Sequence, residues 1–162
     1  MDELKKIVEK NYGHRIRIRV SGIAITEKGI LMIKHRGIGE NGVLWLPPGG
    51  GMDFGENAAD ALLREVKEET GLIAKIEEFM FVNEFNRKPF HAIELFFRIS
   101  LENSDLITGT DPEYSEQIIE EVRFMSEDEI YAMDPRERHN VFGVCKNFVE
   151  LLKLKGYVLF PE

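Results

Sequence analysis

The spacing of apolar residues predicts a short first helix followed by strands. Residues 3–11 carry apolar side chains at helical spacing, which predicts an opening amphipathic helix. From Arg15 to Thr26 apolar and polar residues alternate, as they do in a half-buried strand. The apolar positions change phase at Gly22, where we expect a bulge or bend.

Further strands follow along most of the chain. They are predicted at Ile30–Lys34, Val43–Leu46, Leu72–Phe85 (two short segments or one bent strand), His91–Leu101 and Ile118–Phe124. The last two strands are separated by a polar stretch, residues 103–116, and a loop of this length is usually functional or disordered. Strands outnumber helices without regular alternation, so we expect a mixed sheet.

Two helices are predicted near the C-terminus. Ser126 followed by Glu129 forms a capping box that opens a short helix, which Pro135 ends. A longer helix is expected over residues 140–155, because apolar residues form one stripe there. That stripe includes the single cysteine, Cys145, which we therefore expect to be a buried residue and not a nucleophile.

The overall charge excludes some classes of partner. The 162 residues carry 21 Lys and Arg against 29 Asp and Glu, a formal charge of −8. A protein that holds a nucleic-acid polymer needs clustered positive charge, so we expect no such partner. No apolar run is long enough to cross a membrane, and one cysteine fits a reducing compartment. We therefore expect a cytoplasmic protein without a membrane partner.

Chemistry concentrates in residues 50–72, GGMDFGENAADALLREVKEETGL. Asn57 is a typical N-cap and Gly71 a typical residue after a helix end, so we predict a helix over 58–70. Its core-facing stripe should consist of Ala59, Leu62, Leu63, Val66 and Thr70. The predicted helix therefore buries one side and leaves another side available.

Three carboxylates share that other side. At 100° per residue, Glu65, Glu68 and Glu69 fall within a sector about 100° wide. Like charges at this spacing repel, and Mg²⁺ or Mn²⁺, which prefer carboxylate and water oxygens, would neutralise them. The alternative is a solvated acidic helix face without a ligand.

The spacing of the fixed residues favours the metal site. Gly50, Glu56, Arg64, Glu65, Glu68, Glu69 and Gly71 stand in the order and spacing of the Nudix box, and Val66 and Leu72 supply its aliphatic positions. Seven fixed positions at about 7% each, over about 10² registers, match by chance about once in a million. The segment thus resembles the Nudix hydrolase family.

The resemblance implies a fold and a reaction. The fold is an α/β (α+β) domain in which a mixed β-sheet lies between helices in an α/β/α arrangement, and it would span residues 1–162 as a single domain. The reaction is hydrolysis of a pyrophosphate bond in a nucleoside diphosphate linked to another moiety, with Mg²⁺ or Mn²⁺. ADP-ribose, a nucleotide sugar and a nucleoside triphosphate stay open as substrates, and a homodimer stays open as the assembly.

The resemblance also implies roles for the box residues. Glu65, Glu68 and Glu69 would bind metal, together with the Gly50 carbonyl. Arg64 would hold a carboxylate by a charge-assisted hydrogen bond. The structural residues of the box would be Glu56, which braces the loop to the helix, and Gly71.

The general base and the substrate contacts are less constrained. We expect Glu68 to be the base, while some family members use a glutamate from another loop, for which Glu113 and Glu116 are candidates here. The alternative for both is a solvated acidic loop. The candidate phosphate contact is Arg36, and the candidate stacking residues are Trp45 and Phe90, although single aromatic residues beside a sheet usually belong to the core.

Two other interpretations remain. The arginines that alternate on the first strand, Arg15, Arg17 and Arg19, could face phosphates or form an exposed, ion-paired surface. The whole domain could also be a non-catalytic nucleotide or ADP-ribose sensor on the same fold. A sensor has no chemical need for every box carboxylate, and here all are present.

Overall fold

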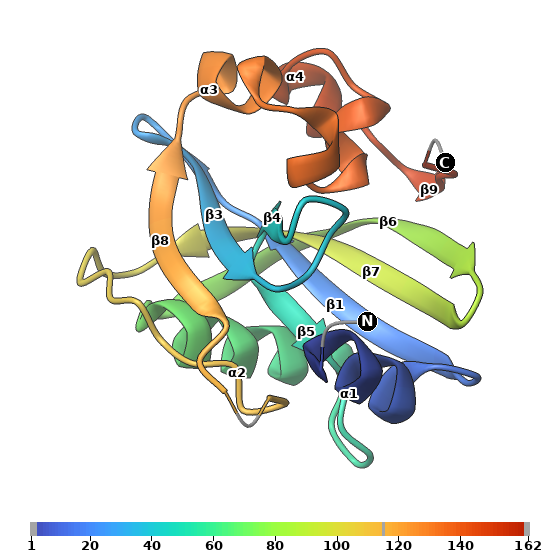
Figure 1. Cartoon of the computed structure of the whole chain (residues 1–162). Coiled ribbons are helices and arrows are strands. Elements are labelled where there is room, and N and C mark those ends of the chain that lie inside the picture. The colour runs from blue at the N-terminus through green and yellow to red at the C-terminus, as the bar shows by residue number, and fades with distance from the viewer. Residues whose placement is uncertain (1–2, 115, 161–162) are drawn as a thin grey trace.

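The computed structural model describes residues 3–114 and 116–160, which form β-sheets between helical segments (Figure 1). The helices are α1 (Glu3–Tyr12), α2 (Ala58–Thr70), α3 (Glu127–Ala132) and α4 (Phe148–Leu151), with 3-10 turns η1 (Pro135–Glu137) and η2 (Asn140–Gly143). The strands are β1 (Ile16–Ile23), β2 (Ile25–Thr26), β3 (Gly29–Arg36), β4 (Val43–Leu46), β5 (Gly49–Gly51), β6 (Ala74–Arg87), β7 (Phe90–Leu101), β8 (Ile119–Met125) and β9 (Gly156–Tyr157).

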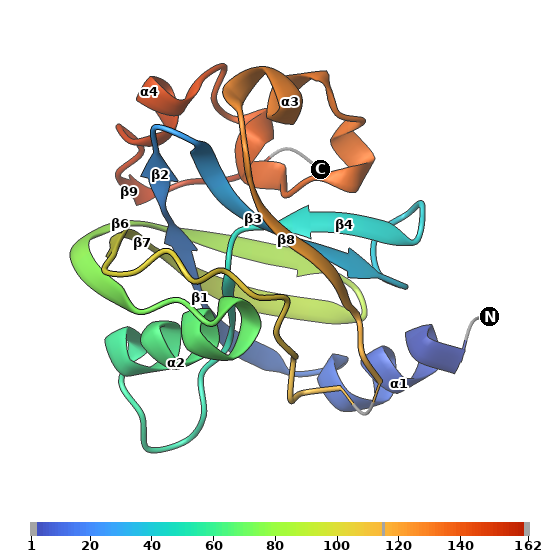
Figure 2. The same ribbon diagram turned by 90° about the vertical axis from the view of Figure 1, so that its left-hand side faces the viewer.

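The strands form two sheets. One has the order β5-β1-β7-β6-β9 and is mixed, because β1 pairs with β7 and β6 pairs with β9 in parallel while the other pairs are antiparallel. The other sheet is antiparallel. In it, β3 lies between β4 and β8, and the short strand β2 pairs with the first residues of β3. Helix α2 covers one side of the sheets, and the segment from α3 to α4 covers the other (Figure 2). The expected mixed α/β/α fold is confirmed.

Two hydrophobic clusters fill the space between these layers. The cluster on the α2 side consists of Val20, Ala24, Leu31, Ile33, Ala61, Leu62, Val66, Leu72, Ile99, Ile119 and Val122. The cluster on the C-terminal side includes Ile23, Met32, Phe81, Phe96, Ile130, Val141, Phe142, Cys145 and Leu151. Cys145 is buried, as its place in the apolar stripe predicts.

The first strand has no bulge at Gly22, contrary to our expectation. β1 pairs with β7 in unbroken register from Ile16 to Ile23. The apolar phase changes because the strand is buried on both faces from Val20 onward, whereas Ile16 and Ile18 remain 63% and 41% exposed. At Gly22 a side chain would collide with Ile99, because a Cβ there would lie 2.7 Å from its Cδ1. The glycine therefore allows close packing, not a bend.

The predicted segment Leu72–Phe85 is one irregular strand. β6 pairs with β7 along Ala74–Arg87, and the register shifts between Ile76 and Glu78 and again between Phe79 and Phe81. Each register shift interrupts the alternation of apolar and polar residues, which is why the pattern also allowed two short strands.

The predicted C-terminal helix over 140–155 is wrong. The segment contains η2, a bend and the separate short helix α4. His139 caps η2 by accepting from Val141 N, and Asn147 caps α4 by accepting from Glu150 N, so each piece has its own start. The stripe nevertheless identified buried residues, since Val141, Cys145 and Leu151 lie in the core.

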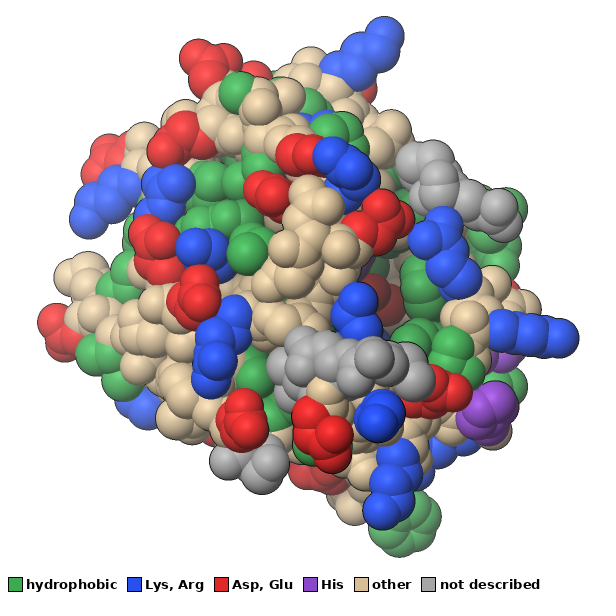
Figure 3. Space-filling view, in the orientation of Figure 1, with side chains coloured by type: hydrophobic (Ala, Val, Ile, Leu, Met, Phe, Trp, Pro, Cys, Tyr) green, Lys and Arg blue, Asp and Glu red, His purple; other side chains and the backbone are tan. Residues whose placement is uncertain are grey.

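Other local predictions are confirmed. α1 spans nearly the predicted range, and Ser126 and Glu129 form the reciprocal capping box of α3. None of the helices in the described part of the chain is long and apolar enough to cross a membrane. Acidic and basic side chains are intermixed on the face seen in Figure 3.

Candidate active site

Three consecutive glycines bring helix α2 against the edge of the mixed sheet. β5 pairs with β1 so that Gly49, Gly50 and Gly51 stand opposite Ser21, Val20 and Arg19. A Cβ at Gly50 would lie 2.5 Å from the carboxyl carbon of Glu65, and one at Gly49 would collide with the Val20 carbonyl. Only glycine therefore permits this approach of backbone and carboxylate.

Helix α2 begins and ends where the sequence predicts. The Asn57 side chain accepts from Asp60 N, and Gly71 adopts φ 72°, with its N–H bonded to the Lys67 carbonyl. Its buried side includes Leu62 and Val66, as expected, but Glu65 and Glu69 are also buried, with exposures of 2% and 1%. The three carboxylates thus do not form an open solvated face, and only Glu68 is partly exposed.

Arg64 connects the loop to the carboxylates. Its Nη2 donates to Glu56 Oε1 at 2.7 Å and its Nε to Glu56 Oε2 at 3.2 Å. Its Nη1 donates to Glu65 Oε1 at 2.9 Å and to Glu68 Oε2 at 3.2 Å. Glu56 also accepts from Asp53 N at 2.7 Å. The contacts expected of Arg64 and Glu56 from the family resemblance are present.

Burial makes two of the carboxyl groups unusual. It raises the pKa of Glu65 to about 7, against the opposing effect of Arg64. It raises the pKa of Glu69 well above its usual range, and the nearby Glu65 charge adds to this, although Glu69 Oε2 accepts from Gly49 N at 2.9 Å. Ionised carboxylates are costly at this depth unless a cation compensates them.

A histidine and an aspartate that the sequence reasoning missed join Glu69. Ligand atoms of His35, Glu69 and Asp111 all lie within 4.8 Å of one another. His35 is 4% exposed, its Nε2 lies 3.9 Å from Glu69 Oε1, and burial lowers its pKa to about 4. Neutral imidazole and carboxylate oxygens are both metal-ligand types. His35 was hidden in the alternation of a strand, and Asp111 in the long polar loop.

That loop packs on the C-terminal end of α2. Ile107, Gly109 and Thr110 donate their N–H groups to the carbonyls of Thr70, Glu69 and Glu68. These bonds satisfy carbonyls that a helix end leaves unpaired. The same anchoring brings Asp111 and Glu113 to the carboxylates, which sequence spacing alone could not reveal.

The two candidate bases from this loop lie in different environments. Glu113 pairs with Arg17, whose Nη2 is 3.0 Å from Oε2, and it accepts from Gly51 N at 3.3 Å. Glu116 is 66% exposed and lies 4.0 Å from Arg36. Only Glu113 is next to the glycine strand.

A cavity of about 310 Å³ opens beside this group of residues. Its walls come from both sheets, α1, the polar loop and the segment after α3, and they include Phe90, His35, Asp111 and Glu113. Trp45 is 7% exposed and belongs to the core, and neither Trp45 nor Arg36 is among the residues that line the cavity. Among the three predicted substrate contacts, the structure places only Phe90 at this cavity.

The donor set fits a hard divalent cation. The Glu65 carboxylate lies beside Gly50, Glu69 accepts from Gly49 N, and Glu68 shares Arg64 with Glu65. Glu65 and Glu69 are buried, and burial raises the pKa of both, so the cationic charge present does not compensate them fully. Such oxygen donors are those preferred by Mg²⁺ and Mn²⁺. The box residues therefore suit the metal that the sequence predicts.

A sequence profile of the NUDIX domain matches residues 15–143, which is most of the chain. The chain belongs to the Nudix family. As a Nudix hydrolase it is an enzyme of the pyrophosphohydrolase type. The recognised segment includes the glycine strand, helix α2 and the polar loop, so the family match covers the site described above.

Relatives of this Nudix hydrolase carry different names. It is 33% identical over 120 residues to an ADP-ribose pyrophosphatase of Methanocaldococcus jannaschii, covering 69% of this chain and 70% of the relative. It is 29% identical to an RNA pyrophosphohydrolase of Campylobacter jejuni subsp. doylei, covering 93% and 98%. The fold resembles a Nudix hydrolase of Nitrosomonas europaea, with a TM-score of 0.65 at 22% identity and coverages of 88% and 78%.

Proposed function

We propose that this chain hydrolyses a pyrophosphate bond in a nucleoside diphosphate linked to another moiety, and that it requires Mg²⁺ or Mn²⁺. The observation that carries the proposal is the complete set of box carboxylates on one helix, with Glu65 and Glu68 held by Arg64 and Glu69 held by the glycine strand. An acidic protein can bind an acidic substrate there because divalent cations reverse the sign of the local field.

The metal would be held by Glu65, Glu68, Glu69 and the Gly50 carbonyl. When bound, it would supply charge neutralisation for the phosphate oxygens and an acidified water. Arg64 positions Glu65 and Glu68 by its two Nη1 hydrogen bonds, and its pairing with Glu56 ties the helix to the preceding loop.

Glu68 is the best candidate for the general base. Glu65 and Glu69 are almost fully buried, whereas the Glu68 side chain is 30% exposed and can reach a water molecule at the surface of the site. Glu113 is the stronger of the two alternatives from the loop, because it accepts from Gly51 N, while Glu116 lies outside, near Arg36.

A small nucleotide derivative is the best-supported substrate class. The cavity beside the box has a volume of about 310 Å³, which is within the range of small-molecule sites, and its walls include α1 and residues 138–140. Phe90 in its wall supports stacking on a base or sugar. The name of the Methanocaldococcus jannaschii relative puts ADP-ribose first in a substrate panel, with nucleotide sugars and nucleoside triphosphates after it. The charge of −8 supports a small molecule over a nucleic-acid polymer, and the lone buried Cys145 supports a reducing, cytoplasmic location.

The test is a substrate panel with product identification. Each compound is incubated with Mg²⁺, with Mn²⁺ and with EDTA, and the phosphorus products are identified by ³¹P NMR. We expect at least one nucleoside diphosphate derivative to give two monophosphate products, only with metal. Turnover that is equal in EDTA would contradict metal dependence.

The same panel separates the enzyme from a sensor. If a compound binds in calorimetry but no compound is hydrolysed with either metal, the sensor is favoured. RNA with a 5′-triphosphate belongs in the panel because of the Campylobacter jejuni relative. Its hydrolysis in preference to every small compound would overturn the proposed substrate class.

A further inference from the structure

A row of polar residues crosses the mixed sheet from the box outward. Arg19 on β1 stands opposite Gly51 of β5 on one side and opposite Glu94 of β7 on the other, and Glu94 in turn stands opposite Asn83 of β6. The side chains of Arg19, Glu94 and Asn83 all line the cavity. A cation therefore lies one strand away from the glycine strand of the active site.

The two cavity arginines of β1 differ in their partners. Arg17 pairs with Glu113, and its guanidinium lies 3.9 Å from the centre of the Tyr12 ring. No hydrogen bond or ion pair joins the Arg19 guanidinium to any residue in 3–114 or 116–160. The alternating arginines are therefore not one ion-paired surface, because Arg17 is paired within the protein and Arg19 is available to a ligand.

Glu94, the carboxylate opposite Arg19, is engaged by two other residues. Glu94 Oε1 accepts from Ser21 Oγ at 2.5 Å, and Glu94 Oε2 lies 3.4 Å from His139 Nε2. Glu94 is 7% exposed, so these contacts fix it within the cavity wall. Glu113 is likewise engaged by Arg17, so neither of these two carboxylates hydrogen-bonds to Arg19.

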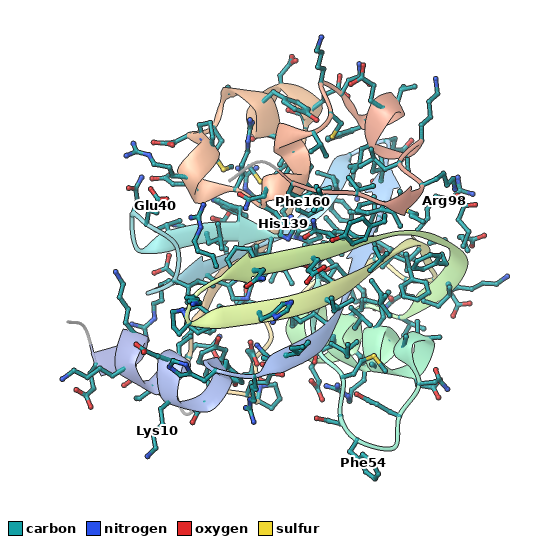
Figure 4. The ribbon with its side chains drawn as sticks, turned by 90° about the vertical axis from the view of Figure 1, so that its right-hand side faces the viewer. Lys10, Glu40, Phe54, Arg98, His139 and Phe160 are labelled. Carbon is teal, nitrogen blue, oxygen red and sulfur yellow. The ribbon has the colours of Figure 1, made fainter. Side chains whose placement is uncertain are left out.

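His139 is itself fixed. Its Nδ1 accepts from Val141 N at 3.1 Å, which leaves Nε2 to donate to Glu94. Its ring packs edge-to-face against Phe96 and Phe160, with centroid distances of 5.5 and 5.6 Å, and Figure 4 shows His139 and Phe160 together above the sheet. The contacts that hold the Glu94 carboxylate are thus rigid.

Glu94 and Glu113 are near enough to raise the pKa of Arg19, but neither accepts a hydrogen bond from its guanidinium. A phosphate of a bound ligand can supply the acceptor, because planar N–H donors match phosphate oxygens and the bond is charge-assisted. The position of Arg19, between the glycine strand and the rest of the cavity, fits a phosphate of a ligand whose other phosphate reaches the box.

We propose that Arg19 binds a phosphate oxygen of the substrate, and that Ser21 and His139 hold the Glu94 carboxylate so that it does not take the hydrogen-bond donors of Arg19. This inference rests on the proposed function, since it concerns the same substrate. It makes Arg19 the residue that discriminates phosphorylated from unphosphorylated nucleosides.

The first test is metal-free binding of matched ligand pairs. ADP, GDP, UDP and CDP are titrated in EDTA beside their nucleosides, and binding is followed by NMR. We expect the wild-type protein to prefer at least one diphosphate, and Arg19→Met to weaken it by about ten- to a hundredfold while sparing the nucleoside. Arg15→Met is the matched control, because Arg15 is exposed immediately before the same strand and its replacement removes the same charge.

The second readout is the Nε–H signal of Arg19, assigned by its loss in Arg19→Met. We expect it to shift when the preferred diphosphate is added and not when the nucleoside is added. Arg19→Lys keeps the charge and should retain part of the preference, which also covers the case in which the methionine variant does not fold.

The outcomes are distinguishable from those of the substrate panel. If Arg19→Met and Arg19→Lys keep the wild-type preference for the diphosphate, or the wild type has none, the inference is wrong even if the panel reveals turnover. If the panel reveals no turnover but Arg19 controls diphosphate binding, the inference holds and the hydrolase proposal fails.

Discussion

Replacing Glu65 by Gln should stabilise the metal-free protein at high pH. The Glu65 carboxyl is 2% exposed, and burial raises its pKa to about 7. The folded state therefore prefers the protonated acid, while the unfolded chain ionises near 4.5. Stability is lost as the pH rises from 4.5 through 7, and glutamine, which is neutral and of similar shape, removes this dependence.

The shift in pKa sets the size of the effect. The difference between about 7 and 4.5 corresponds to about 3 kcal/mol at pH 8, of which about 1 kcal/mol is already present at pH 5. We therefore expect the wild-type free energy of unfolding to fall, relative to that of Glu65→Gln, by about 2–3 kcal/mol between pH 5 and pH 8. The glutamine oxygen can still accept from Arg64, so this contact offsets little of the change.

The assay is urea unfolding in EDTA at pH 5 and pH 8. Glu102→Gln, at an exposed position, is the control and should follow the wild type at both values. Adding Mn²⁺ at pH 8 should raise the stability of the wild type more than that of Glu65→Gln. If the free energy of unfolding changes by the same amount between pH 5 and pH 8 in the wild type and in Glu65→Gln, the reasoning is refuted.

Three further predictions concern the glycine strand, the cavity and the core. Gly50→Ala should abolish metal-dependent hydrolysis while leaving the circular dichroism spectrum unchanged, because its Cβ would displace the Glu65 carboxylate; full activity would contradict this. Burial would raise the pKa of Glu94, but His139, Arg19 and Ser21 outweigh it and lower that pKa to about 2. The free energy of unfolding of the wild type should therefore fall by about 2 kcal/mol more than that of Glu94→Gln when the pH is lowered from 6 to 3 in urea unfolding. Equal losses of unfolding free energy in the two proteins would contradict this. Leu62→Ala should cost about 2–5 kcal/mol of unfolding free energy in the same assay, since Leu62 is fully buried, and a cost below about 1 kcal/mol would place it outside the core.

The sequence predicted the elements whose signals are local. Helix α2 has the predicted bounds because Asn57 caps its start and Gly71 its end. The predicted helix over 140–155 failed because His139 and Asn147 each start a new turn, and apolar spacing records burial without recording a break. The bulge at Gly22 failed for a related reason, since burial on both faces changes the apolar phase of a regular strand.

The candidate site divides in the same way. Glu65, Glu68, Glu69 and Arg64 lie on one helix, so spacing alone brings them together. His35, Asp111 and Arg19 reach the site from two different strands and a loop, through pairing and loop anchoring that no local pattern records. Trp45 was a substrate candidate because it is aromatic, and its burial in the core became visible only in the fold.

The most direct test of metal-dependent hydrolysis at the box is the rate of Glu68→Gln on the best substrate of the panel, in saturating Mn²⁺. Glu68 is partly exposed, so the variant should fold, and Glu102→Gln provides the control. Loss of the proposed general base should lower kcat by about 10²–10⁴-fold, while Glu102→Gln keeps the wild-type rate. A Glu68→Gln enzyme with wild-type kcat would contradict the assignment of this carboxylate to the chemistry.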